Sequence, residues 1–255
     1  MLQDTDAASG LATNASSMVT WHQDLMASAR LVSAGVVGGL LMGAIIGGIG
    51  GRLAMLVLRV TSDPSVRGMK TDDGFIIGRF SGDTTFLLVF TSVLGVLGGI
   101  LYLAARPWLP EGWRAWFAGV FGGVVGGAIF IRPDGVDFAR LDPLPLAVGM
   151  FIGLPAVYGV TMSLLMERLL RQGSRWSRSK AWILGLLPLV AIAAFGPLGV
   201  GVIVVMSGLW AIHRWSPETT SMLRSRTVVW LGRAVLLTLT ALGLVALIKD
   251  VDQVL

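Results

Sequence analysis

Residues 181–212 form a run of 32 residues without a charged side chain, which is longer than one helical crossing of a bilayer requires. Other long apolar runs precede and follow it. Hydrophobic residues make up 54% of the 255 residues, glycine adds 34, and charged residues are 14%, against roughly 25% in soluble domains. A chain this apolar cannot stay solvated, which excludes both disorder and an ordinary soluble enzyme. The sequence therefore predicts an all-α, polytopic helical membrane protein.

The apolar runs predict about seven transmembrane helices within one domain, residues 31–255. These spans lie near 31–55, 84–105, 115–131, 144–166, 181–195, 197–212 and 227–248. Gly196-Pro197 divides the longest charge-free run because a helix breaks readily there, and a re-entrant pair is the alternative to two crossings. The first run is too long for one crossing, so residues 53–60 should continue beyond the membrane or along its surface. Pro155 is expected as a kink within the fourth span.

Residues 1–30 are expected to form an N-terminal segment outside the spans. Met18, Trp21, Leu25, Met26 and Ala29 recur at helical spacing, which is typical of an amphipathic helix lying in the membrane interface. A helix that docks onto a partner is the alternative. The first 29 residues contain no Lys or Arg, unlike a cleaved signal peptide, so we expect the first span to be retained.

The charges of the loops set the predicted orientation. Residues 167–180 contain five Lys or Arg side chains and only one acid, Glu167, so the positive-inside rule places this loop in the cytoplasm. Alternation then puts the N-terminus in the cytoplasm and the C-terminus outside, with all nine tryptophans beside cytoplasmic ends. We expect the plasma (inner) membrane. The net charge of +5 is explained by these topology-determining residues, so the expected partner is the lipid bilayer and not nucleic acid.

Glycine recurs at every fourth position in two of the expected spans. Residues four apart share one helix face, and a face without side chains lets another helix backbone approach closely. Packing within one subunit is the expected role, while a homo-oligomer seam and the wall of a narrow pore are alternatives. The ridge residues are Gly35, Gly39, Gly43, Gly47 and Gly51 in the first span and Gly119, Gly123 and Gly127 in the third.

A shift of 61 residues indicates an internal repeat. It aligns Asp73-Gly74 with Asp134-Gly135 and Arg79 with Arg140, and it gives seven identities in 34 aligned positions. In so biased a composition about three or four identities arise by chance, so the number alone is weak support. Each copy would be a glycine-ridged helix, an outer loop and a returning helix. The two copies would then be parallel helical hairpins.

Polar residues gather in two outer loops, 61–83 and 132–143. Mixed Asp and Arg with glycine suits turns tied by ion pairs, and a bound cation or an acid–base pair are alternatives. Arg52, inside the first apolar run, either reaches the interface or pairs with an aspartate of the first loop. The candidate outer-loop site consists of Arg52, Asp72, Asp73, Arg79, Asp83, Arg132, Asp134, Asp137, Arg140 and Asp142.

No residue pattern in the chain indicates an enzyme. Cysteine is absent, His22 and His213 lie in separate flanks, and no phosphate-loop, zinc-protease or hydrolase motif occurs, so no catalytic residue, metal or cofactor is predicted. The spans carry no Asp, Glu, Lys or His between their ends, which argues against proton coupling through buried carboxylates. We expect small-solute permeation by a channel or facilitator. The alternative is a non-catalytic assembly or interaction subunit of a larger membrane complex, and a membrane enzyme ranks third.

Overall fold

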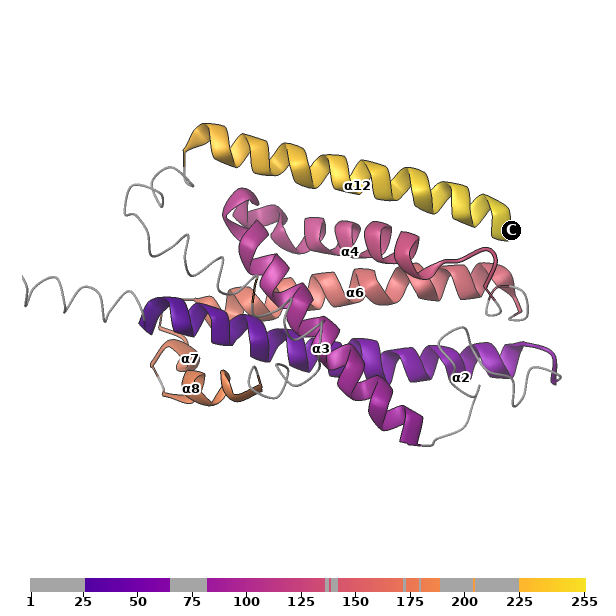
Figure 1. The fold of residues 1–255 in the computed structure, drawn as a ribbon, viewed down its shortest axis with the longest axis horizontal. Helices are drawn as coiled ribbons and strands as arrows, with labels where there is room; N and C mark the ends of the chain where they lie inside the picture. Colours follow the sequence, from indigo (N-terminus) through magenta and orange to yellow (C-terminus); the bar gives the residue numbers. More distant parts are fainter. Residues whose placement is uncertain are drawn as a thin grey trace, which may run out of the picture.

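Five long helices make up most of the part of the chain that the structure describes (Figure 1). This computed structural model describes residues 26–64, 82–135, 138, 142–171, 173–178, 180–188, 204 and 225–255, with no strand among them. The helices long and apolar enough to cross a membrane are Met26–Thr61, Thr85–Trp108, Glu111–Phe130, Leu144–Leu170 and Arg226–Val254. The prediction of an all-helical protein with several membrane-length helices is confirmed. The expected spans 181–195 and 197–212 lie outside the described residues from 189 onward, apart from Val204.

The first long helix has three parts, which follow one another without a break. Residues 26–42 are α-helical, η1 (Gly43–Gly50) is π-helical, and α2 (Gly51–Thr61) is α-helical again. Residues 53–60 continue this helix, and Leu58 is buried in a cluster with Ile131, Ala147 and Leu247. Whether they extend beyond the membrane or lie along its surface stays a prediction. Residues 26–30, expected to end an interfacial helix, belong to this same helix, while residues 16–25 lie outside the described residues.

The remaining helices run back and forth beside the first. In Figure 1, α3 (Gly82–Ala105) crosses the first helix obliquely, α4 and α6 lie side by side, and α12 lies along the far side of α4. Pro155 lies inside α6 without ending it, and the Ser225 hydroxyl caps α12 by accepting a hydrogen bond from the Val228 N–H. The other elements are η3 (Arg106–Trp108), η4 (Glu111–Trp113), α4 (Arg114–Phe130), α6 (Leu144–Leu170), α7 (Arg175–Arg178), α8 (Ala181–Leu184) and α12 (Arg226–Val254).

The first helix and α3 pack through backbone that carries no side chain. A Cβ atom on Gly39 would meet the carbonyl oxygen of Gly95, and one on Gly43 would meet the carbonyl oxygen of Thr91. A Cβ on Gly35 would meet the Leu103 side chain, 2.6 Å from its Cδ1. Glycine at these positions lets the two helix backbones approach more closely than any other residue would allow.

The glycines of α4 contact α6 in a similar way. A Cβ on Gly119 would meet Val160, one on Gly123 would lie 3.1 Å from the Cβ of Ala156, and one on Gly127 would lie 3.0 Å from Ile152. Two further glycines, Gly122 and Gly126, face Pro155 of α6. In the first helix, by contrast, Gly51 has nothing within 4 Å of its Cβ position.

Charge separates the two ends of the helix bundle. One end gathers the start of the first helix, the η3–η4 turn, the end of α6, α7, α8 and the start of α12. We call it the basic end, and the described side chains there are the bases Arg30, Arg106, Arg114, Arg168, Arg171, Arg175, Lys180, Arg226 and Arg233 and the acids Glu111 and Glu167. The described charged side chains at the opposite end are the bases Arg59, Arg132 and Lys249 and the acids Asp63, Asp134, Asp142, Asp250 and Asp252.

A candidate polar site at the basic end

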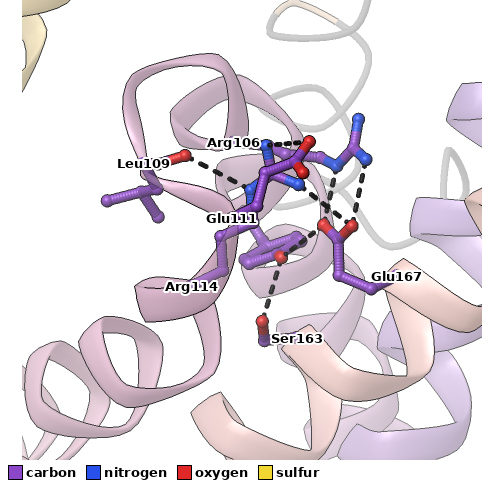
Figure 2. A network of polar contacts seen from close by, with 7 residues as sticks. Arg106, Leu109, Glu111, Arg114, Ser163 and Glu167 are labelled. Atoms are coloured by element: carbon purple, nitrogen blue, oxygen red, sulfur yellow. Dashed lines mark hydrogen bonds and ion pairs between the residues drawn. The ribbon is translucent and has the colours of Figure 1, made fainter.

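Glu167, near the end of α6, is the centre of the most extensive side-chain network in the described residues (Figure 2). Arg106 donates from Nε to Oε1 at 2.7 Å and from Nη2 to Oε2 at 3.0 Å, so this pair is bidentate. Arg114 donates from Nη1 to Oε2 at 3.0 Å. The Tyr102 hydroxyl donates to Oε1 at 2.9 Å and accepts a hydrogen bond from the Ser163 hydroxyl at 2.9 Å.

Arg114 is the most enclosed charge of this network, with 11% of its side chain exposed. Its Nε donates to the carbonyl oxygen of Leu109 at 3.3 Å, which ties the guanidinium to the turn before α4. Glu111 lies 3.8 Å from Nη2, but 89% of its side chain is exposed, so this contact contributes little. The Arg114 charge is therefore balanced mainly by Glu167.

The local sequence explains how two arginines reach one carboxylate. Arg106 follows α3 directly as the first residue of η3, Pro107 is the second residue of η3, and Pro110 is the N-cap residue of η4. Both prolines restrict the backbone, and the resulting turn sets Arg114 at the first position of α4. Glu167 lies on the neighbouring α6, so its ion pairs link α3, α4 and α6 at one level.

The arrangement suits a structural tie better than catalysis. An ionised carboxylate has about four acceptor positions, and Glu167 receives four hydrogen bonds, two on each oxygen. No acceptor position then remains for a metal ion or for proton transfer. In the described residues, no three His, Cys, Asp or Glu side chains gather where they could hold a metal ion.

The structure describes only part of the outer-loop site expected from the sequence. Asp72, Asp73, Arg79, Asp137 and Arg140 lie outside the described residues, as does the side chain of Asp83.

The members of that site that the structure describes do not form a cluster of side chains. Arg132 and Asp134 are exposed in the turn after α4. Arg52 is half-buried and interacts with another group. Asp142 takes part through its backbone: its carbonyl oxygen accepts from the Ser62 hydroxyl at 2.9 Å, and its N–H donates to the same hydroxyl at 2.8 Å.

Sequence reasoning did not single out the Glu167 network, because Glu167 was considered only as one charge in a basic loop. A signal was nevertheless present in the shift of 61 residues. It aligns Tyr102 with Ser163 and Arg106 with Glu167, and both of these pairs are hydrogen-bonded. Arg106 and Glu167 carry opposite charges and are 61 positions apart. Their ion pair joins the end of α6 to the turn that follows α3.

Comparison with known proteins adds no further information, because no family model, curated protein or solved structure matches the chain.

Proposed function

We propose that this protein is a non-catalytic assembly or interaction subunit of a larger membrane complex. The observation that carries the proposal is the large apolar surface of α12: 17% of its most apolar stretch is buried, the lowest share of the five long helices, against 22% in α4 and α6 and 44% in the first helix. The exposed side chains on α12 include Leu237 at 61% and Val245 at 68%. In a complex, a partner helix would cover part of this surface by close packing.

The polar groups inside the bundle favour the same proposal over permeation. The Tyr158 hydroxyl donates to the Gly95 carbonyl at 2.7 Å, and the Ser33 hydroxyl donates to the Trp182 carbonyl at 2.6 Å. Thr91, Thr161 and Thr240 donate to carbonyl oxygens one turn earlier in their own helices. The Tyr158 and Ser33 bonds join neighbouring helices, and the three threonine hydroxyls are satisfied within their own helices, so all five donors are already used inside the protein.

A photo-crosslinking amino acid placed on α12 tests the assembly proposal. We expect discrete heavier products in native membranes from Leu237 and Val245. Leu236, which is 8% exposed, is the buried control and should give none. A product of twice the chain mass would identify a second copy as the partner. Lipid adducts alone at both exposed positions would contradict the proposal.

Small-solute permeation is the second candidate, favoured by the π-helical η1 segment. π-Helical turns are rare and occur often at functional sites, and η1 is eight residues long. Purified protein in proteoliposomes should then conduct a small solute. Absence of flux for a panel of ions and neutral solutes would remove this candidate.

We further propose seven crossings in the plasma membrane, with the basic end in the cytoplasm. The charge difference between the ends and the positive-inside rule support this orientation. Because the chain contains no cysteine, single cysteines at Ser177 and Val254 can be labelled without background. An impermeant thiol reagent on intact cells should label the Val254→Cys variant and spare Ser177→Cys. Equal labelling of the two would contradict the orientation.

The glycine contacts between the first helix and α3 and between α4 and α6, which we call the two glycine seams, bear on the proposal that the chain contains two parallel hairpin repeats. In the first hairpin, Gly39 faces Gly95, and in the second, Gly123 faces Ala156. Ala156 is 61 positions after Gly95, the shift that gives the sequence identities, whereas Gly123 is 84 positions after Gly39, so the first helices of the two hairpins align only with a gap. If the hairpins are separate units, coexpressed fragments 1–110 and 111–255 should associate and co-purify.

A further inference from the structure

Arg233 is a charged residue placed well inside an apolar helix. It lies seven residues after Arg226, the first residue of α12, and therefore about 10 Å further along the helix axis. Its Nε donates to the carbonyl oxygen of Trp108 at 2.8 Å. A charge at this depth needs an anionic or polar group to stabilise it.

The bond to Trp108 fixes the orientation of the guanidinium, and no other described residue accepts a hydrogen bond from its outer edge. Among the described residues, the Trp108 carbonyl is the only hydrogen-bond acceptor for Arg233, and neither Nη atom is enclosed without a partner. The guanidinium carbon lies 5.4 Å from the ring centre of Trp230. The two Nη groups thus form a planar pair of donors, the geometry that binds two oxygens of one phosphate.

Packing around Gly232 keeps this donor pair in place. A Cβ on Gly232 would overlap the indole of Trp108, so η3 and α12 touch here at the distance that only glycine permits. Arg226, Trp230 and Arg233 are spaced by four and three residues, which sets them on one face of α12. Trp230 is 58% exposed, and indole rings favour the headgroup level of a bilayer.

We propose that Arg233, flanked by Trp230, is a binding site for the phosphodiester of a phospholipid headgroup, with preference for an anionic lipid. The preference for an anionic lipid comes from the net positive charge of the basic end, where the described side chains include nine basic and two acidic ones. A phosphate oxygen pair accepts from Nη1 and Nη2 while Nε stays on the Trp108 carbonyl. This inference does not depend on whether the protein is an assembly subunit or a permease.

Native mass spectrometry of the purified full chain with added lipid tests the site. The probes are dioleoyl-phosphatidylglycerol, dioleoyl-phosphatidylcholine and inorganic phosphate. Wild-type protein should bind phosphatidylglycerol more tightly than phosphatidylcholine. Arg233→Gln should weaken phosphatidylglycerol binding about tenfold, which corresponds to about 1.4 kcal/mol, the low end for a hydrogen bond to a charged group.

Two further variants separate the site from general charge effects. Lys249→Gln removes one positive charge from the other end of the same helix, where the side chain is exposed, and should bind lipid like wild type. Arg233→Lys keeps the charge but loses the planar donor pair, so its binding should be intermediate. It also serves as the test if Arg233→Gln does not fold.

Three results would overturn the proposal. The first is lipid binding by both Arg233 variants equal to that of wild type. The second is an equal loss in Lys249→Gln, which would indicate a general charge effect. The third is displacement of phosphatidylglycerol by millimolar inorganic phosphate, which would assign the site to a soluble anion instead of a lipid.

Discussion

Replacing Glu167 with glutamine should destabilise the fold more than any other single charge change at the basic end. The substitution preserves size but removes the negative charge, and the glutamine NH₂ group would face arginine donors that now point at a carboxylate oxygen. Arg114 would keep its charge with 11% of its side chain exposed and without its main counterion.

The expected loss follows from the geometry of the network. Breaking a buried ion pair from one side costs about 3–5 kcal/mol. Glu167 and Arg106 are 32% and 29% exposed, so water partly compensates and the expected loss is below that range. We expect a loss of about 2–3 kcal/mol, which lowers the melting temperature by about 4–12 °C in a chain of this size.

Size-exclusion chromatography after heating, in a mild detergent, measures this change. Glu111→Gln is the matched control, because Glu111 also faces Arg114 but is 89% exposed and should show no resolvable shift. A double-mutant cycle between Glu167→Gln and Arg114→Gln should give a coupling of about 1–2 kcal/mol, since each change removes the partner of the other. If the Glu167→Gln and Glu111→Gln variants have the same melting temperature, the network does not hold α3, α4 and α6 together.

Two more predictions concern packing and the opposite end of the bundle. Gly39→Ala should lower the melting temperature, because its Cβ would meet the Gly95 backbone and overpacking costs about 1–3 kcal/mol, whereas Gly51→Ala, with open space at its Cβ, should be neutral or stabilising. Equal melting of the two variants would show that the glycine seam does not need close approach. Ser62→Ala removes both hydrogen bonds to the Asp142 backbone and should cost about 1–2 kcal/mol. Thr61→Val should cost less, because the Thr61 hydroxyl divides its donor between Asp142 and carbonyls of its own helix, and a larger loss for Thr61→Val would refute this account.

The positions of the long helices could be predicted from the sequence because a bilayer imposes a simple rule on composition. A crossing helix needs about 20 apolar residues, and few charged residues interrupt such runs in this chain. The expected span 115–131 differs from α4, Arg114–Phe130, by one residue at each end. The ends of the other helices extend further than expected, because charged residues such as Arg168 and Asp250 continue the helix beyond the apolar run.

The polar network could not be predicted by the same rule, since hydropathy treats every charge near a span end alike. Whether Glu167 is a solvated loop charge or an ion-pair centre depends on which helices lie beside α6. Arg106 and Arg114 reach it only because α3 and α4 meet at the η3–η4 turn. Contacts between distant segments are set by tertiary packing, and the only trace of them in the sequence was the complementary pairing at a separation of 61 residues.

The ends of the described helices constrain the number of crossings between α6 and α12. α6 ends at the basic end with Leu170, and α12 begins at the same end with Arg226, beside Trp108 (Figure 1). We therefore expect an even number of crossings between them.

Two short crossings and a re-entrant pair both satisfy this condition, and a cysteine at Gly196 distinguishes them. Gly185, directly after α8, packs against Ser33 and Val37 of the first helix. Two crossings would place residue 196 at the opposite end, so an impermeant thiol reagent should label Gly196→Cys as readily as Val254→Cys on intact cells. A re-entrant pair would leave residue 196 within the bilayer, where neither side offers the thiol to a water-soluble reagent. Protection of Gly196→Cys from both sides, with Val254→Cys labelled, would therefore reduce the number of crossings from seven to five.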